Sequence, residues 1–205
     1  TTAGQTTQAT GLKAISATGH TVGSLAKMNT SGATYSDWIF RNADQFYSHQ
    51  VATKSAGSNA TISFANLGAL GMVRVKRTDA AGSWYVWHRS LSAGQLLVGE
   101  TTAAAATLGH VTVSGATVTL VNGVIADGTY LVEAFAHDTG ADGIIQCVSI
   151  TLDGSGSGSV NFGWEPQFLM LKKTGGVSNW LALDTTRGFN TNLFGSSILY
   201  PNLAN

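Results

Sequence analysis

The chain has 205 residues, enough for one large β-sandwich or two small ones and for a substantial hydrophobic core. Its 11 basic and 11 acidic residues cancel, and charged residues make up only 11% of the sequence. This balance provides no basic surface for a nucleic acid or an anionic membrane, so we expect no nucleic-acid partner. The apolar runs are short and interrupted by glycine, well below the roughly 18 residues of a membrane span, so we expect no membrane insertion.

The local pattern is typical of strands joined by tight turns. Glycine outnumbers proline by 25 residues to two. Short runs rich in Val, Ile, Tyr and Trp alternate apolar and polar residues with a period of two, and Gly, Asn, Asp or Ser bounds each run. No segment keeps a period of 3.6. The sequence therefore predicts an all-β fold, an antiparallel β-sandwich.

The chain also repeats itself internally. In chain order, the matching blocks are residues 32–40 with 127–135, residues 51–64 with 149–162, and residues 75–89 with 171–185. The last pair sets Lys76 on Lys172 and Trp84 on Trp180. The offsets are 95, 98 and 96 residues, as expected where only loops change length. We therefore expect two sandwich repeats of about 95 residues.

These repeats divide the chain unequally. Residues 46–138 form one complete unit, whereas residues 1–45 hold only a second half and residues 139–205 only a first half. A half-sandwich would expose sheet edges and an apolar face, which favours aggregation. We expect the two halves to complete a second unit, either within one chain, between neighbouring chains, or as a piece of a longer array.

Within the complete unit, the alternation in RVKRT assigns the side chains to two faces. We expect Val73 and Val75 to face the core, and Arg74 and Lys76 to face water. Cys147 cannot form an internal disulfide because it is the single cysteine. Its setting, IIQCVSI, predicts a strand, and we expect a buried structural thiol there rather than a nucleophile.

Four blocks carry a family resemblance: TYSDWIFRNADQFY, GMVRVKRTDAAGSWYVWHRSL, TYLVEAFAHD and GWEPQFLMLKKTGGVSNWLALDTTRGF. They resemble repeats in large virion proteins of tailed bacteriophages, of the tail-fibre-like type with concanavalin-like or laminin-G-like jelly-roll sandwiches. The resemblance spans most of the chain, but its motifs are structural and mark no active site. It implies a jelly-roll sandwich on the exterior of a phage particle, with other virion proteins as partners and a homo-oligomeric state.

Three functions follow from the resemblance and the residues. The first is a structural part of a tail fibre or another surface appendage that takes part in host adhesion. The second is a capsid or tail decoration protein with a purely stabilising role. The third, a carbohydrate-active enzyme, is less favoured because the sequence marks no pair of carboxylates roughly 5–10 Å apart. Fold analogy alone does not choose among them.

A host-surface glycan is the ligand that the first function implies, and aromatic side chains are the candidate contacts. Trp84 and Trp180 occupy equivalent repeat positions, which indicates packing residues. Trp87 and Trp164 have no aromatic equivalents, so we assign the expected carbohydrate-binding site to them.

Other polar groups have simpler interpretations. Glu133 precedes His137 and Asp138 in a pattern that could suggest acid-base chemistry, but Trp38 replaces the acid in the other copy. Aspartates in Gly-rich loops, namely Asp138, Asp142 and Asp153, are expected to be solvated turn residues rather than calcium ligands. Asp184 and Arg187 are expected to form a salt bridge or a turn-stabilising contact at a strand end rather than a ligand-binding pair. We therefore predict no catalytic residues, no metal site and no cofactor.

Overall fold

A computed structural model of the chain describes residues 2–3, 5, 8–26, 29–35, 37–189 and 197–203. The chain forms two compact units, one made of Thr1–Gly4 with Arg41–Asn205 and the other of Gln5–Phe40. Parts of the predicted half-repeats, including Ser36 and residues 190–196, lie outside the described residues. Within the described part of the chain, no helix has the length and apolar character needed to cross a membrane.

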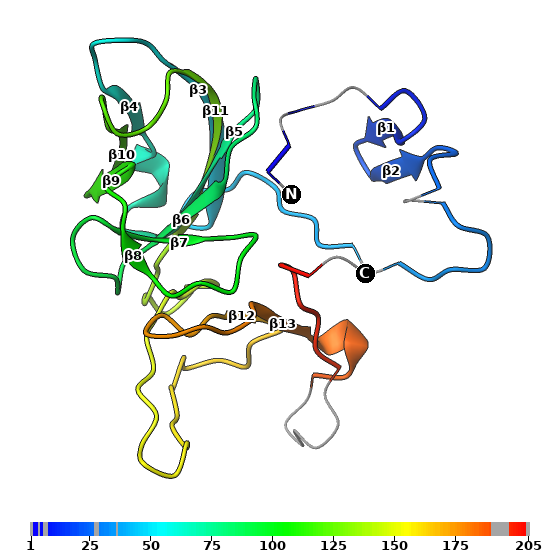
Figure 1. The fold of residues 1–205 in the computed structure, drawn as a ribbon. Coiled ribbons are helices and arrows are strands. Elements are labelled where there is room, and N and C mark those ends of the chain that lie inside the picture. Colours follow the sequence, from blue (N-terminus) through cyan, green and yellow to red (C-terminus); the bar gives the residue numbers. More distant parts are fainter. Residues whose placement is uncertain are drawn as a thin grey trace. The chain divides into compact units, whose positions relative to one another are not determined.

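The larger unit is built on an antiparallel sheet of six strands in the order β3-β11-β5-β6-β7-β8 (Figure 1). These strands are β3 (Tyr47–Lys54), β5 (Leu70–Arg77), β6 (Trp84–His88), β7 (Gln95–Val98), β8 (Ala106–Thr107) and β11 (Gly128–Ala136). The longest strand, β11, pairs with β3 on one side and with β5 on the other. Strands far apart in the sequence are therefore neighbours in the sheet.

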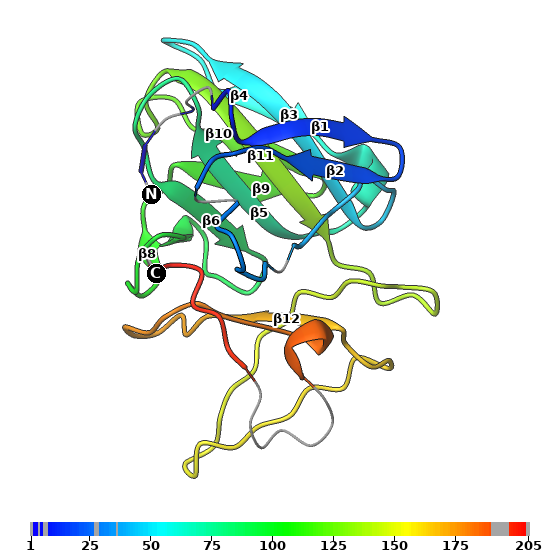
Figure 2. The same cartoon turned by 90° about the vertical axis from the view of Figure 1, so that its right-hand side faces the viewer.

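A second antiparallel sheet has the order β4-β10-β9. It consists of β4 (Ala60–Ser63), β9 (Val111–Ser114) and β10 (Thr117–Leu120), and a short 3-10 helix, η1 (Ala65–Leu67), follows β4. Strands of both sheets are labelled in Figure 2, which is turned by 90° from Figure 1. The core cluster that they share includes Ile62, Phe64, Leu67, Val73, Val75, Leu96, Val111, Val118, Leu120, Tyr130, Val132, Ala134 and Ala136. The predicted all-β antiparallel sandwich is confirmed.

The two faces of β5 agree with the predicted alternation at all but one position. Val73 and Val75 are fully buried, and burying a valine contributes about 1.5–3 kcal/mol. The expectation that Lys76 faces water was wrong, since only 7% of it is exposed. Its ammonium group donates hydrogen bonds to the backbone carbonyls of Thr2 and Gly82, which compensates for part of the cost of burying a charge.

A second hairpin repeats the pairing of the first. It consists of β12 (Phe168–Leu171) and β13 (Leu181–Asp184), followed by the short helix η2 (Thr185–Arg187). Met72 pairs with His88 in β5–β6, and Phe168 pairs with Asp184 in β12–β13. Both members of the second pair lie 96 residues after those of the first, and the next three pairs keep this offset. Leu199 then bridges Ala182, much as Leu97 pairs with Val86.

The smaller unit contains a hairpin of β1 (Leu12–Ser16) and β2 (Gly19–Val22). Its register matches that of β9–β10. Ser16 pairs with Gly19, and Ser114 pairs with Thr117. Ser16 and Gly19 lie 98 positions before Ser114 and Thr117. The next two pairs keep the same offset.

Other predicted blocks do not form strands. Residues 37–40 and 144–162 contain no strand, so the predicted strand around Cys147 was wrong. This segment has no paired neighbouring strand, and a strand is stable only with such a partner. Two hairpins therefore reproduce the repeat offsets, while a complete second unit stays a prediction.

Cys147 is half-buried at the end of the large sheet. Burial raises the pKa of its thiol to about 11, and its sulfur lies 3.7 Å from the carbonyl oxygen of Ala136. Gly71 makes room for it. A Cβ added at Gly71 would lie 2.6 Å from both the Cβ and the Sγ of Cys147 and 2.7 Å from the Ala136 oxygen. This thiol is thus a packing group.

The Gly71→Ala substitution should destabilise the larger unit by about 1–3 kcal/mol, because the added methyl group overlaps side-chain and backbone atoms. Urea denaturation would measure the loss. Gly175→Ala is the matched control, since a Cβ there meets no atom within 4 Å. Equal stability of the two variants would contradict the packing described here.

Candidate functional site

The outer face of the six-stranded sheet, opposite the core, carries a group of polar and aromatic side chains. Strand register places His49, Glu133 and Arg74 side by side on β3, β11 and β5. Tyr47 and Trp84 are next to them on β3 and β6. We call Tyr47, His49, Arg74, Trp84 and Glu133 the outer-face cluster.

Glu133 connects this cluster. The Tyr47 hydroxyl donates a hydrogen bond of 3.0 Å to Glu133 Oε1. Arg74 Nε lies 3.5 Å from Glu133 Oε2, so the two side chains form an ion pair. The Arg74 guanidinium carbon is 4.6 Å from the centre of the Trp84 ring, within the range of a cation–π interaction. The contacts thus run across four neighbouring strands, from β3 through β11 and β5 to β6.

Tyr47 is the most buried member, with 7% of its surface exposed. Its ring packs against Phe135 with the ring centres 4.9 Å apart. Burial, reinforced by the negative charge of Glu133, raises the pKa of Tyr47 to about 12. Tyr47 therefore keeps its proton at neutral pH and stays a hydrogen-bond donor to the carboxylate.

This arrangement combines an acceptor, a cationic donor and aromatic rings, which are groups that orient a polar ligand. The other residues that the sequence grouped with Glu133 are engaged elsewhere. His137 Nδ1 accepts a hydrogen bond of 3.1 Å from the Cys147 amide, and Asp138 Oδ1 accepts one of 2.8 Å from the Gly140 amide. These contacts hold the three side chains in separate environments rather than as an acid-base group.

The two predicted carbohydrate-binding tryptophans lie in different surroundings. Trp87 pairs with Val73 in the sheet and packs, partly buried, against the main core cluster. Trp164 lies in the loop before β12, is 36% exposed and has its ring centre 5.7 Å from that of Phe162. Of the two, Trp164 is the one with an aromatic neighbour at the surface.

Trp84 and Trp180, at equivalent positions of the repeat, are buried to different extents. Trp180 is 6% exposed and packs with Val86 and Leu97 on the outer face of β6 and β7. Trp84 is half-buried beneath Arg74.

The aspartate in the Gly-rich loop at residues 153–157 accepts hydrogen bonds from the backbone of its own turn. Asp153 Oδ1 accepts hydrogen bonds from the amides of Ser155 and Ser157 and from the Ser155 hydroxyl, which closes the turn. These bonds lower the pKa of the Asp153 carboxyl. Among the described residues, no group of three or more His, Cys, Asp or Glu side chains is placed to hold a metal ion.

Two ion pairs, each with one buried member, also have a structural role. Asp184 is 6% exposed, and its carboxylate accepts hydrogen bonds from the Arg187 amide and guanidinium, both of 2.9 Å. The predicted salt bridge is confirmed. Lys54, 2% exposed, donates to Asp127 and Asn122 at 2.6 and 2.7 Å. A shallow depression of about 320 Å³ lies beside this pair.

The outer-face cluster could not be recognised from the sequence because its members come from four strands. The available signal was the alternation in YSHQ and VEAF, which puts Tyr47, His49 and Glu133 on one face once β3 and β11 are paired.

A family model described as a domain of unknown function, DUF7483, matches residues 1–205. No curated protein and no solved structure matches the chain.

The Glu133→Gln substitution should lower the pKa of Tyr47 from about 12 toward its ordinary value of 10, because it removes the neighbouring negative charge. Burial should keep the pKa above 10. Carbon-13 NMR of the tyrosine Cζ as a function of pH measures the value, and Tyr47→Phe identifies the resonance. Glu165→Gln, at an exposed position, is the control and should leave the pKa unchanged.

The raised pKa of Tyr47 also makes the stability of the fold depend on pH. The raised pKa means that the folded state holds this proton more tightly, so the stability that it contributes is complete below pH 10 and is lost as the pH rises toward 12. If the pKa of Tyr47 were the same in Glu133→Gln as in the wild type, this would contradict the contact between Tyr47 and the Glu133 carboxylate.

Proposed function

The chain belongs to the DUF7483 family, and we propose that it is a structural module of a bacteriophage virion, part of a tail fibre or another surface appendage that takes part in host adhesion. The observation that supports this proposal is the recurrence of hairpin register at fixed offsets, 96 residues for β5–β6 with β12–β13 and 98 for β9–β10 with β1–β2. Such recurrence is expected of a protein built from stacked units, and the sequence resembles repeats of large phage virion proteins.

A repeated rigid sandwich suits adhesion through many weak contacts. Each module needs little affinity, because copies held at fixed spacing bind a surface with a combined strength that exceeds that of one contact. The partners on this proposal are other virion proteins, further copies of the chain and a host-surface glycan. Its location is the exterior of the particle.

Trp164 is the residue that we assign to glycan contact. A flat ring at the surface can stack on the apolar face of a sugar, and Phe162 beside it widens the aromatic surface. Trp87 is the weaker candidate because it packs against the core. His49, the exposed member of the outer-face cluster, is the place for a second, polar contact on the same proposal.

The second candidate is a purely structural role as a capsid or tail decoration. Exposed apolar side chains favour it: Ile15 is 78% exposed and Ile144 65%, as expected of surfaces that pack against other proteins.

A carbohydrate-active enzyme is the least favoured function, since Tyr47 and Arg74 engage the Glu133 carboxylate.

The adhesion proposal predicts that the chain binds a subset of host-type polysaccharides on a glycan array and that Trp164→Ala reduces this binding at least about tenfold, the loss of roughly 1.4 kcal/mol of contact energy. Val177→Ala, at a position 75% exposed, is the control and should bind like the wild type. Both variants should keep the wild-type unfolding midpoint.

A folded chain that binds no glycan would contradict adhesion and favour the decoration role. Electron cryo-microscopy of the particle that carries the chain then distinguishes an appendage from a capsid surface. Release of reducing sugar from host polysaccharide would instead support the enzymatic alternative.

A further inference from the structure

We propose that the side chains of Lys54 and Asn122 form an isopeptide bond with each other, and that Asp127 transfers a proton in the reaction. The reaction takes place within one chain and releases one ammonia. The inference concerns the covalent structure of the larger unit and does not depend on the proposed phage function.

The three side chains meet where the two sheets come together. Lys54 is the last residue of β3 in the six-stranded sheet, Asn122 follows β10 of the three-stranded sheet, and Asp127 directly precedes β11. The Lys54 ammonium group donates one hydrogen bond of 2.7 Å to Asn122 Oδ1 and one of 2.6 Å to Asp127 Oδ1. An amine, a carboxamide and a proton acceptor therefore share one contact.

Lys54 is buried, although its carboxylate partner is not. The side chain of Lys54 is 2% exposed, and that of Asp127 is 50% exposed. Lys54 lies two residues after Ala52, which packs against the main core, so strand alternation directs both side chains to the core side of the sheet. Burying a charge is costly. An isopeptide bond removes this cost, because the product is a neutral amide.

The backbone around Asn122 is held in place by hydrogen bonds. The Asn122 amide donates one of 2.8 Å to Asn59 Oδ1. The Val121 amide donates to the His110 carbonyl at 3.0 Å, and the Val121 carbonyl accepts a bond of 3.1 Å from the amide of Ile125, which is buried in the core. The carboxamide is thus fixed beside the amine, and fixed reactants combine as if in a unimolecular step.

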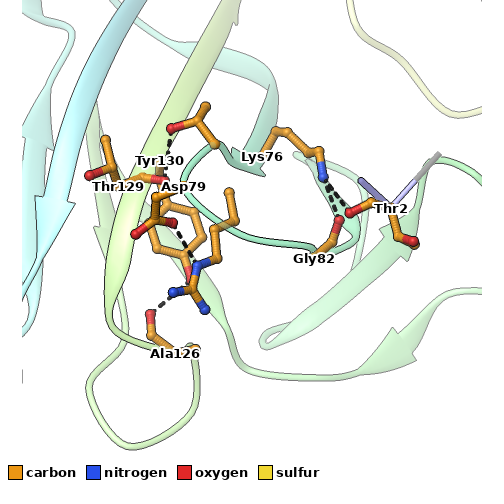
Figure 3. Close-up of polar contacts among 9 residues, drawn as sticks. Thr2, Lys76, Asp79, Gly82, Ala126, Thr129 and Tyr130 are labelled. Atoms are coloured by element: carbon orange, nitrogen blue, oxygen red, sulfur yellow. Dashed lines mark hydrogen bonds and ion pairs between the residues drawn. The ribbon is translucent and has the colours of Figure 1, made fainter. Parts of the chain in front are cut away.

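The backbone on both sides of Asp127 is also fixed. The Tyr130 hydroxyl donates a hydrogen bond of 2.8 Å to the carbonyl of Ala126 (Figure 3), and Tyr130 itself is 2% exposed. Gly128, directly after Asp127, pairs with Lys54 in the sheet. The carboxylate is therefore held opposite the end of β3, where the amine lies.

The bond forms by nucleophilic attack on the carboxamide. Asp127 takes one proton from the Lys54 ammonium group, which leaves the free amine that attacks. The amine nitrogen then bonds to Asn122 Cγ, and the electron pair of the carbonyl moves to Oδ1. When this pair returns, the Cγ–Nδ2 bond breaks, and the leaving nitrogen takes the proton held by Asp127 and a second proton from Lys54 Nζ. The products are the Lys54–Asn122 amide and an ammonium ion, and Asp127 is a carboxylate again.

Lys76 is also buried but lacks this chemistry. Its ammonium group donates hydrogen bonds to the backbone carbonyls of Thr2 and Gly82, at 3.0 and 2.6 Å (Figure 3). A backbone carbonyl carries no amide group that can leave as ammonia. Lys76 should therefore stay unmodified, and it is an internal control in the same protein.

The bond would join the two sheets covalently. A depression of about 320 Å³ borders Lys54, Asn122 and Asp127, so the released ammonia has a route to solvent. The linked residues are 68 positions apart in the sequence. A cross-link over such a distance restricts the unfolded chain and favours the folded state.

Mass spectrometry of the purified full chain tests the proposal. The denatured wild-type chain should be lighter than its sequence by the mass of one ammonia. Trypsin does not cut after an acylated lysine, so the digest should contain residues 42–76 joined to residues 90–172. Fragmentation of this product should locate the link at Lys54 and Asn122.

Two variants should remove the link. Lys54→Arg keeps the positive charge but has no amine, and Asn122→Ser removes the carboxamide at an exposed position. Both should have the full mass of their sequences and give no joined peptides. Asp127→Ala should slow formation of the link about 100-fold or more, as expected when a general acid-base group is lost. Lys173→Arg, also at an exposed position, is the matched control and should form the link like the wild type.

Three outcomes would overturn the proposal. The first is a folded wild-type chain of full mass that trypsin cuts after Lys54. The second is equal loss of ammonia from Lys54→Arg, which would indicate that the Asn122 side chain cyclises onto the Gly123 amide instead. The third is loss of water in place of ammonia, which would indicate a bond from Lys54 to Asp127.

Discussion

The rest of the sandwich depends on the pairing of β11 with two strands at once. One strand of nine residues is hydrogen-bonded to β3 and to β5, which are separated from it by more than 50 residues of sequence. Its alternate side chains reach both faces of the sheet. Tyr130, Val132 and Ala134 face the core, and Glu133 faces outward, so one register fixes both the core and the outer-face cluster. A shift of one residue would exchange the two sets.

The outer face shows how a polar group is held on such a sheet. Glu133 takes part in an ion pair with Arg74 and accepts the Tyr47 hydrogen bond, and the Trp84 ring supports the guanidinium from the next strand. None of these contacts is local in sequence. The group is therefore as rigid as the sheet itself, and rigidity of this kind favours recognition of a ligand by fixed polar groups.

Much of the fold could be predicted from the sequence because periodicity and repetition are local signals. The burial of Val73 and Val75 follows from alternation, and the β5–β6 hairpin and its copy follow from the match of Lys76 with Lys172. Other features depended on partners that alternation cannot specify. The pattern predicts Lys76 at the surface, yet the carbonyl of Thr2, distant in sequence, accepts a hydrogen bond from its ammonium group.

The same reason explains why the strand predicted around Cys147 was wrong and why the outer-face cluster was not predicted. The residues around Cys147 have the composition of a strand, but a strand also needs a neighbour to pair with, and these residues instead contact Ala136 and His137 through irregular backbone. The outer-face cluster became visible only when β3, β11, β5 and β6 were placed in order. Trp87 looked free for binding because it has no aromatic equivalent in the repeat, whereas pairing with Val73 turns it to the core.

The buried lysines affect how the stability of the fold depends on salt concentration. Lys54 and Lys76 have their ammonium groups in short contacts inside the protein, and only 11% of the residues are charged. At physiological salt, mobile ions screen exposed charges that are more than about 8–10 Å apart, but they screen buried groups far less. The fold, and contacts made through its neutral Ser, Thr and Asn surface, should therefore be nearly indifferent to salinity. Copies of the chain should therefore associate without electrostatic steering, at low and at high salt concentration.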